Sequence, residues 1–394
     1  MEKASSINRR VGFIIVLSNI FNAMAVDIYL PSLPLIQKYF NTSEYKTQLI
    51  IVGFYFGAVL SRLFWGPFSD ILGRRRAILA AYSIQAFFQL LCIYSPNIDC
   101  IILFRVLQSL GSGVTGVIGT AIIADYYTGN ERARMLNIVE LSFIIAFIFA
   151  PSFGVVLNEI YGWQGGFVFI FLSYIFSFLL FYYFLPVDII RKPQLYINII
   201  PKLFNIYKND FNWKILKFSF ISGISAGLFM GFAIKAPFIY FLKFSISSYE
   251  YIIFQMSPFV INFVISVAYK KIIDKISITK TISLCMYALV LLSIFSLCVA
   301  QEIIYSTKYT YFFIMCYISA IMPFLIAGGI TLALKDVISK GAGSSISASI
   351  RSLCLFSVMY ATTMISTESY HIFYIIPFLT ISLIMLWCSI KNTA

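Results

Sequence analysis

The sequence predicts an all-α protein that crosses a membrane many times, and three observations support this fold class. Of its 394 residues, 60% are hydrophobic and 11% are charged, whereas about a quarter of the residues in a water-soluble domain are charged. Apolar runs of about 20 residues recur from end to end, and a helix of that length crosses a hydrocarbon core of about 30 Å. Lys and Arg are frequent in every second connection between these runs and scarce in the others.

Twelve apolar runs are long enough to be transmembrane helices. We place them at 11–30, 47–66, 77–95, 99–124, 135–157, 165–185, 215–240, 249–269, 279–300, 310–334, 344–366 and 371–390. The first can continue past Pro31, because membrane helices tolerate a proline where neighbouring helices satisfy the freed backbone groups. The cation-rich connections lie on the same side as both termini, and the positive-inside rule puts that side in the cytoplasm. The net charge of +13 therefore reflects membrane topology rather than binding to nucleic acid.

Several function classes find no support in the residue types. The seven cysteines show no paired spacing and His371 is the single histidine, so we expect no metal site. The sequence shows no nucleophile–base set and no phosphate-binding loop, and we therefore expect neither enzyme activity nor a cofactor.

The chain divides into two halves of six predicted spans each. The longest polar connection, 186–214, mixes Lys and Arg with apolar residues, which suits a segment lying on the anionic cytoplasmic leaflet. We therefore expect one bundle at 1–185, an interfacial linker at 186–214 and a second bundle at 215–394. The loop at 269–275 has the same place in the second half as the loop at 66–76 has in the first, which indicates an internal repeat like those of many transporters.

The loop at 66–76 carries a motif of a known family. It resembles the loop signature G-x-x-S/A-D-x-x-G-R/K-R/K of the major facilitator superfamily through Gly66, Ser69, Asp70, Gly73, Arg74 and Arg75. Arg105 and Gln108 resemble part of the family's fourth-helix motif. The run 27–34 is similar to the first-helix element of its bicyclomycin-resistance-type drug/proton antiporters. The fifth-helix antiporter motif of the family is similar to Ala146, Ala150, Pro151 and Gly154.

This resemblance implies a fold and a function. The implied fold has two pseudo-symmetric six-helix bundles around a central cavity, with both termini cytoplasmic. The implied function is secondary active transport of a small molecule across the inner (cytoplasmic) membrane, driven by the proton gradient and carried out by a monomer. The loop at 66–76 would pin the cytoplasmic ends of the second and third helices and act as a cytoplasmic gate, with Asp70 as its key charge.

Six charged residues lie within predicted spans, where each costs about 2.5–3.5 kcal/mol at the centre of a helix. They are Asp27, Arg62, Arg105, Glu140, Lys235 and Arg351. Asp27 is predicted to carry the transported proton, since burial favours the neutral carboxyl and a nearby cation favours the ionised one. The alternative is a permanent ion pair with Arg105. Arg105 would serve proton coupling or helix anchoring, and Glu140 would be a second proton carrier, an interfacial residue or a hydrogen-bonding group within the bundle.

Three residues are predicted to contact the substrate: Tyr29, Lys235 and Arg351. Lys235 could bind an anionic group of the substrate, neutralise Asp27 or extend towards the interface. Arg351 could equally extend towards the cytoplasm along its apolar stem. We assign Arg62 to the inner gate or to lipid headgroups.

Three transport hypotheses follow. The leading one is proton-coupled export of small amphiphilic compounds, as in multidrug efflux. The alternative is a dedicated exporter of an endogenous anionic metabolite, such as a polycarboxylate siderophore, with Lys235 and Arg351 as the partners of its carboxylates. A proton-coupled uptake symporter is the third.

Overall fold

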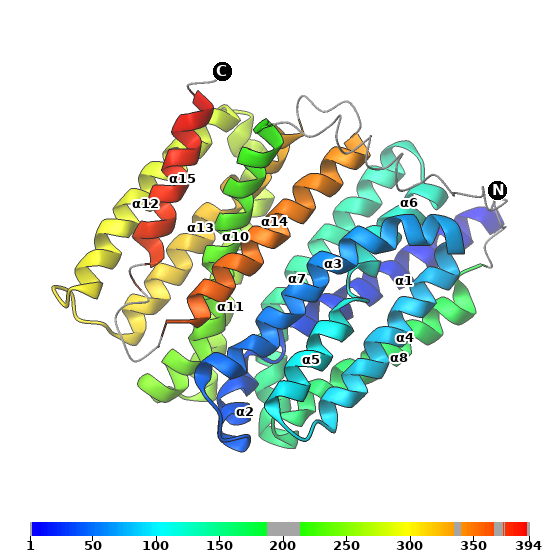
Figure 1. The fold of residues 1–394 in the computed structure, drawn as a ribbon. Helices are drawn as coiled ribbons and strands as arrows, with labels where there is room; N and C mark the ends of the chain where they lie inside the picture. The colour runs from blue at the N-terminus through cyan, green and yellow to red at the C-terminus, as the bar shows by residue number, and fades with distance from the viewer. Residues whose placement is uncertain (1, 187–212, 335–339, 366–372, 374, 392–394) are drawn as a thin grey trace. The chain divides into compact units, whose positions relative to one another are not determined.

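The chain forms two compact helical units, Met1–Ile197 and Asn198–Ala394 (Figure 1). The structure is a computed structural model that describes residues 2–186, 213–334, 340–365, 373 and 375–391. These residues form helices and turns and contain no β-strand. The predicted linker at 186–214 lies outside the described residues except at its two ends.

The N-terminal unit consists of long helices and short helical segments. They are α1 (Glu2–Asp27), η1 (Leu30–Ser32), α2 (Leu33–Tyr39), α3 (Glu44–Leu72), α4 (Arg74–Ile93), α5 (Ile98–Ser109), η2 (Thr115–Gly119), α6 (Thr120–Tyr126), α7 (Gly129–Tyr161) and α8 (Gln164–Phe184). Helix α3 packs against α5, α4 against α8, and α1 against α7 and α8. Figure 1 shows α4 and α8 side by side.

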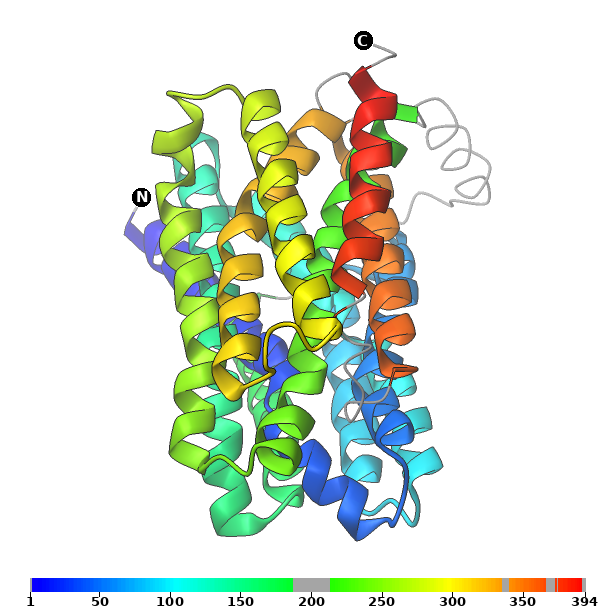
Figure 2. The same cartoon turned by 90° about the vertical axis from the view of Figure 1, so that its left-hand side faces the viewer.

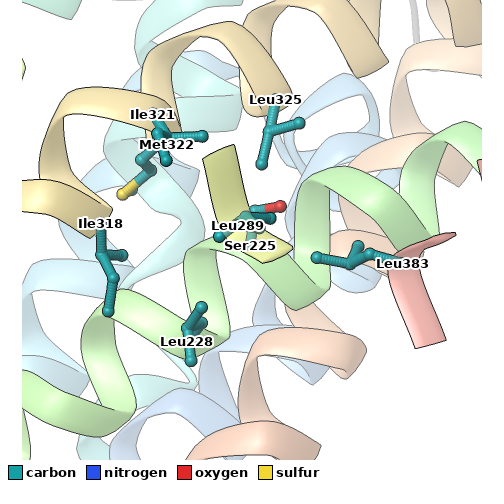
Figure 3. Close-up of a pocket in the computed structure, with 8 residues that line it drawn as sticks. All are labelled: Ser225, Leu228, Leu289, Ile318, Ile321, Met322, Leu325 and Leu383. Carbon is teal, nitrogen blue, oxygen red and sulfur yellow. The ribbon is translucent and has the colours of Figure 1, made fainter. Parts of the chain in front are cut away.

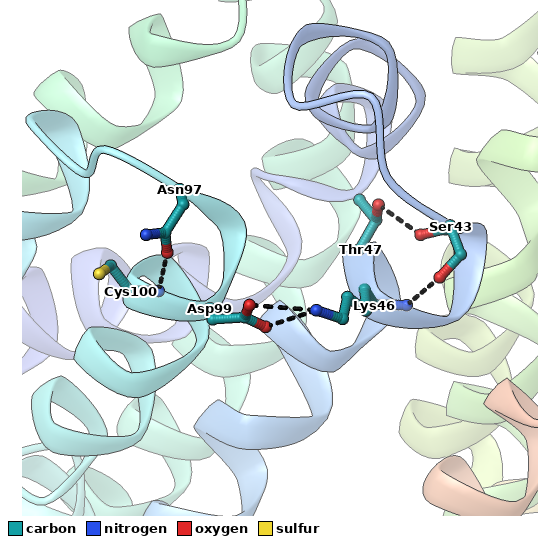
Figure 4. Close-up of polar contacts among 6 residues, drawn as sticks. All are labelled: Ser43, Lys46, Thr47, Asn97, Asp99 and Cys100. Atoms are coloured by element: carbon teal, nitrogen blue, oxygen red, sulfur yellow. Dashed lines mark hydrogen bonds and ion pairs between the residues drawn. The ribbon is translucent and has the colours of Figure 1, made fainter.

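Polar side chains fix the starts of α3 and α5 (Figure 4). The side chain of Ser43 accepts a hydrogen bond from the Lys46 N–H, and that of Asn97 accepts one from the Cys100 N–H. Such N-caps satisfy backbone donors that have no partner within the helix. Lys46 and Asp99 form an ion pair of 2.9 Å that joins the two helix starts. Both side chains are largely exposed, so this pair adds little stability.

Two predicted spans are broken in the structure. The first span was expected to continue to 30 or past Pro31, but α1 ends at Asp27, and the short segments η1 and α2 follow. Pro31 and Pro34 lack the N–H groups that a continuous helix would need. The span predicted at 99–124 is divided at 110–114, where the Cβ of any residue other than glycine at Gly111 would lie 2.5 Å from the Ala81 carbonyl oxygen.

The C-terminal unit has its own core. Its elements are α10 (Trp213–Pro237), η3 (Phe238–Lys243), α11 (Ser248–Ile273), α12 (Ile278–Ala300), α13 (Lys308–Ala333), α14 (Lys340–Thr363) and α15 (Ile375–Lys391). Helix α10 is buried along most of its length and packs against α13 and α14. Figures 1 and 2 show α15 (red) beside α12 (yellow).

A stripe of glycines brings α10 close to α14. A Cβ at Gly223, Gly227 or Gly231 would lie 2.6–2.7 Å from a side-chain atom of α14. The three glycines are four residues apart, so they share one face of α10. Small residues of this spacing allow helices in a membrane to approach closely.

The all-helical, multi-span architecture predicted from the sequence is confirmed. Each of the twelve predicted spans coincides with helix for most of its described length. Among the described residues, eight helices are long and apolar enough to cross a membrane. The other four predicted spans lie in α3, in the divided α5–α6 region, in α14 and in α15, so twelve crossings and the cytoplasmic side of the termini remain predictions.

Candidate functional site

Asp27 is a buried carboxyl at the end of a helix. It is 1% exposed, and its Oδ2 has no hydrogen-bond partner among the described residues. Pro31, four residues later, has no N–H to donate to the carbonyl of Asp27, so the helix cannot continue regularly. Asp27 therefore combines an ionisable group in an apolar interior with a break in the backbone. Such groups are rare in membrane proteins and usually functional.

Arg105 is held without a carboxylate partner in the part of the chain that the structure describes. Its Nη1 donates to Gln108 Oε1 at 2.9 Å, its Nη2 to the Ala25 carbonyl at 3.2 Å and its Nε to the Ile50 carbonyl at 3.4 Å. The guanidinium also lies between two aromatic rings, those of Tyr29 and Phe54, each 4.5 Å away. Carbonyl dipoles and aromatic faces both stabilise a buried cation.

The permanent ion pair between Asp27 and Arg105, weighed from the sequence, is therefore absent from this conformation of the described residues. The guanidinium instead binds the backbone of α1 at the Ala25 carbonyl, two residues before Asp27. Tyr55 of α3 lies within electrostatic range of both charges. Two of the three predicted proton-coupling residues, Asp27 and Arg105, thus lie within electrostatic range of the same tyrosine.

Glu140 is not part of this cluster. It is exposed on α7, next to Val139, whose carbonyl accepts a hydrogen bond from Asn19. Asn19 is eight residues before Asp27 on α1, about 12 Å along the helix axis. Any role of Glu140 in proton transfer would therefore be at a different depth from that of Asp27.

The ring of Tyr29, which packs against the guanidinium of Arg105, is itself fixed by two contacts. Its hydroxyl accepts a hydrogen bond of 2.8 Å from Gln89, and its ring lies 4.3 Å from that of Phe167. The side chain is fully buried. A direct contact between Tyr29 and a substrate, as predicted from the sequence, would require another conformation.

Buried amides complete the site, and the sequence interpretation missed them. Gln85 donates to the side chain of Asn22 at 2.8 Å, and Asn22 donates to the Ser112 carbonyl at 2.9 Å. Gln108 donates to the Tyr174 hydroxyl at 3.2 Å. The available signal was the presence of Asn and Gln inside apolar spans, where polar side chains find partners on neighbouring helices.

The predicted antiporter motif packs against the break after Asp27. Ala146, Ala150, Pro151 and Gly154 of α7 are all buried. A Cβ at Gly154 would lie 2.2 Å from the Ile28 carbonyl oxygen and 2.9 Å from the ring of Pro31. The four residues recur at helical spacing, and α7 contacts both α1 and η1. The motif therefore gives α7 a face of small residues, and the segment that follows Asp27 packs closely against this face.

The predicted gate loop ties four helices together within the N-terminal unit. Gly73 has φ +90°, which favours glycine, and it lets α4 start directly after α3. Arg74 donates to Ser69 of α3 at 2.5 Å and pairs with Asp125 of α6 at 3.4 Å. Arg75 donates to the Tyr182 carbonyl of α8 and lies over the Tyr182 ring. Gly66 lies in α3, and the side chain of Asp70 lies outside the described residues.

Lys235 and Arg351 belong to the C-terminal unit and lie far from each other. Lys235 is 1% exposed, and its Nζ donates to the Ile365 carbonyl just beyond the end of α14. A cation at a helix C-terminus is favoured by the helix dipole. Arg351 is half-buried on α14, fourteen residues before Ile365, which corresponds to about 20 Å along the helix. The structure does not bring these two cations to one site. Arg62 is exposed on α3.

A pocket in the C-terminal unit does not resemble a substrate site. It is lined by Ser225, Leu228, Leu289, Ile318, Ile321, Met322, Leu325 and Leu383 (Figure 3). Its volume is about 10 Å³, which holds one water molecule at most. The hydroxyl of Ser225 already donates to the Ile221 carbonyl at 2.7 Å. We interpret this pocket as a packing defect.

Comparisons with known proteins identify the family. The model of the Major Facilitator Superfamily matches residues 15–358. A protein named "Uncharacterized transporter" from Rickettsia bellii is 34% identical over 225 residues, 56% of this chain and 54% of the relative. A "Bicyclomycin resistance protein homolog" from Haemophilus influenzae is 26% identical over 220 residues, 55% of this chain and 54% of the relative.

"Citrate exporter 1" of Aspergillus niger is 28% identical over 157 residues, 40% of this chain and 30% of the relative. The chain thus spans about half the length of the first two relatives and less of the third. Among solved structures, a D-xylose–proton symporter matches with a TM-score of 0.71 and 12% identity, over 96% of this chain and 97% of that chain. At this identity the match supports the fold alone.

Proposed function

The chain belongs to the Major Facilitator Superfamily, and from this premise we propose that it is a proton-coupled exporter of small amphiphilic compounds. The family consists of transporters, so the chain is a multi-pass membrane transporter of a small molecule and not an enzyme. Proton coupling, the direction of transport and the class of substrate are our proposal. The observation that carries it is the burial of the Asp27 carboxyl and of the Arg105 cation, both within electrostatic range of Tyr55.

Asp27 is suited to carry a proton. In this conformation Oδ2 is buried without a hydrogen-bond partner among the described residues, and an ionised carboxylate in such a place is strongly disfavoured. Movement of Asp27 towards a cation would favour the ionised form. A conformational change that alters the distance to Arg105 would therefore release or take up one proton.

The backbone gives Asp27 a way to move. It lies at a helix end, and the break that follows it rests on Gly154 of α7. Arg105 joins α5 to α1 and α3 through the carbonyls of Ala25 and Ile50. A shift of α1 would thus change the surroundings of Asp27 and the contacts of Arg105 together, which is the coupling that alternating access requires.

The proposed substrates are small amphiphilic compounds moved out across the inner membrane by a monomer. Similarity to a bicyclomycin resistance protein homolog supports export of this kind. The residues around Asp27 also support it, since the packed groups are aromatic rings and neutral amides rather than several cations.

A second candidate is export of an anionic metabolite such as a polycarboxylate siderophore. Similarity to Citrate exporter 1 favours it, as does the buried cation Lys235. Lys235 of α10 binds the Ile365 carbonyl, and Arg351 lies about 20 Å from Ile365 along α14. The two cations could therefore not both hold one small polycarboxylate within this unit. Lys235 would be the partner of the carboxylate.

Proton flux in inverted vesicles tests both candidates. The lumen is acidified, and a cationic, a neutral or a polycarboxylate compound is added outside. An exporter that exchanges protons raises the lumenal pH after addition of its substrate, whereas a symporter lowers it. Asp27→Asn should abolish the response, and Asp99→Asn, which alters an exposed carboxylate paired with Lys46, should keep it. A normal response in Asp27→Asn would remove Asp27 from the mechanism.

The same assay separates the two substrate classes. A response to polycarboxylates that is lost in Lys235→Gln would support the anionic metabolite. Gln retains a donor for the Ile365 carbonyl but removes the charge. A response to cationic and neutral compounds that persists in Lys235→Gln would support the amphiphilic class.

A further inference from the structure

Gln255 of α11 is a buried amide without a hydrogen-bond partner in the part of the chain that the structure describes. The residue is 1% exposed, and neither Oε1 nor Nε2 of its side chain makes a hydrogen bond to a described residue. Among the described residues, no other side chain has two buried polar atoms in this situation. Buried polar groups in proteins nearly always have partners, and an unpaired one destabilises the fold. The amide is therefore available to a bound molecule.

The residues one turn to either side of Gln255 show what it faces. Tyr251 and Phe259 lie four residues before and after it, so the three share one face of α11. The ring of Tyr251 lies 6.2 Å from that of Tyr240 in η3. The ring of Phe259 lies 5.1 Å from that of Phe229 in α10. Gln255, between the two contacts, therefore faces the stretch of chain from Phe229 to Tyr240.

Aromatic rings surround this stretch. The Tyr311 ring of α13 lies 5.4 Å from that of Tyr240 and 5.6 Å from that of Phe232, whose carbonyl accepts a hydrogen bond from the Tyr311 hydroxyl. The Tyr240 ring also lies 5.3 Å from that of Phe254. The Tyr240 hydroxyl is buried and makes no hydrogen bond to a described residue. The face of α11 that carries Gln255 thus meets flat apolar surfaces and one polar hydroxyl.

The charged residues of the described C-terminal unit are directed elsewhere. Lys235 lies at about the depth of Gln255, but it continues the glycine stripe of α10 that faces α14, and its Nζ donates to the Ile365 carbonyl. Glu250 and Lys308, at the starts of α11 and α13, pair with each other at 2.9 Å. The residues placed around Gln255 are therefore uncharged, which favours a neutral ligand, because an unpaired charge is costly to bury.

We propose that Gln255 is the hydrogen-bonding group of a subsite for a neutral amide, such as a carboxamide or a lactam. The Gln side chain offers both donors and an acceptor. Nε2 would donate to the ligand carbonyl, Oε1 would accept from the ligand N–H, and the flat part of the ligand would pack on the rings of Tyr240 and Tyr251. The inference rests on the proposed function and deepens it, because it names a chemical group of the amphiphilic substrate.

A carboxylate fits this subsite less well than an amide. It could accept from Nε2, but it has no N–H for Oε1, and its negative charge would lie beside that oxygen. The subsite therefore separates neutral amides from polycarboxylates, whose candidate partner is Lys235 on another face of α10.

A proline gives α11 a point at which the subsite can open. Pro258 follows Gln255 by three residues and leaves the Phe254 carbonyl without its donor in the helix, and such sites allow a helix to bend. The Pro258 carbonyl accepts a hydrogen bond from Ser319 of α13, which fixes the part of α11 that follows. A bend would thus move the part that carries Tyr251 relative to α13 and give a ligand access to the amide.

Thermal unfolding of the full chain without ligand is the first test. Gln255→Met replaces the amide by an apolar side chain of the same length. The Tm should rise, because the change removes buried polar atoms that have no bond to lose. Gln48→Met is the matched control: Gln48 is also buried but donates to Glu44, so its Tm should fall. A fall in Gln255→Met would show that the amide is bonded in the substrate-free protein, by water or by the chain, and would overturn the subsite.

Binding of two matched probes is the second test. 2-Naphthamide and methyl 2-naphthoate have similar shapes, but the ester lacks the N–H that Oε1 would accept. Both are titrated by calorimetry into the chain in lipid nanodiscs, and the signal of empty nanodiscs is subtracted. The unmodified chain and Gln48→Met should bind the amide about tenfold more tightly than the ester, the effect of leaving one buried acceptor unpaired. Gln255→Met should bind both probes equally.

Three results of the titration overturn the subsite: no binding of 2-naphthamide up to its solubility limit, equal binding of both probes to the unmodified chain, or an unchanged preference in Gln255→Met. These results differ from failure of the proposed function, because the titration needs no proton gradient. If Asp27→Asn loses proton flux and Gln255→Met keeps the preference, the function stands and the subsite is wrong. If Asp27→Asn keeps the flux and Gln255→Met loses the preference, the subsite stands and the role of Asp27 is wrong.

Discussion

At the scale of single residues, the site depends on how one buried cation is held. Arg105 is stabilised by carbonyl oxygens, an amide and two aromatic faces. Its charge is therefore not cancelled by the carboxylate of Asp27 in this conformation. A cation that is already solvated by neutral groups can attract Asp27 in another conformation without being freed from an ion pair first. An arginine held by neutral groups can therefore take part in a protonation switch, whereas an arginine in a permanent ion pair has only a structural role.

Arg105→Lys should be damaging although the charge is kept. A guanidinium donates from three nitrogens in a fixed plane and stacks on rings, whereas an ammonium cannot reach Ala25, Ile50 and Gln108 together. We expect a loss of about 2–3 kcal/mol of stability, the worth of one or two hydrogen bonds to a charged group. Thermal unfolding in detergent measures it, with Arg76→Lys at an exposed position as the control. Equal stability of the two variants would contradict this account of Arg105.

The sequence located the charged residues of the site but not their partners. Asp27 and Arg105 stand out because ionisable groups are rare in apolar spans. Besides Gln108 of its own helix, the partners of Arg105 are two backbone carbonyls and two rings from other segments, and every residue has a carbonyl. No residue type along the chain could have indicated which ones it meets. The amides of Asn22 and Gln85 were visible in the sequence, but their pairing depends on how the helices of the unit are placed.

At the scale of helices, hydropathy predicts where the helices lie along the chain. It does not predict where a helix is interrupted. Long apolar runs form helices because, in lipid, the backbone N–H and C=O groups must form their hydrogen bonds within the segment. The end of α1 at Asp27 and the division at 110–114 depend instead on single prolines and on glycines that touch another helix. The first span does continue past Pro31, to Tyr39. The sequence did not show that it would do so as α1, η1 and α2 rather than as one regular helix.

The absence of a side chain at Gly154 lets α7 pack closely against the backbone that follows Asp27. Gly154→Ala would place a Cβ 2.2 Å from the Ile28 carbonyl oxygen, and backbone cannot yield as a flexible side chain can. We expect a loss of about 1–3 kcal/mol, the usual effect of overpacking, and a change in the rate of transport because the break is displaced. Gly116→Ala is the control, since nothing lies within 4 Å of a Cβ there.

The measurement for Gly154 is thermal unfolding together with proton flux in vesicles. Loss in Gly154→Ala with a neutral Gly116→Ala would support the assigned contact. If both alanine variants behave like the unmodified chain, then α7 does not pack on the break in the way described.

At the scale of the whole molecule, two units that each bury their own core are joined by one connection. The division falls at Ile197–Asn198, within the segment that the sequence predicts to be an interfacial linker. In the N-terminal unit the core is built on α1, α3, α4, α5, α7 and α8, and in the C-terminal unit on α10, α13 and α14. Each buried network described above, whether around Arg105 or around Lys235, is formed by residues of one unit only.

This organisation predicts that the chain can be divided at the linker. Residues 1–197 and 198–394, produced together as two chains, should insert and restore proton-coupled transport in part, since a break there cuts no contact within either core. A break after Tyr94, between α4 and α5, should abolish transport, because α4 packs on α5 and α8, and Gln89 and Arg105 on either side of the break hold Tyr29. Membrane fractionation and vesicle proton flux measure the two outcomes. Equal transport from both pairs, or none from the pair divided at the linker, would contradict this prediction.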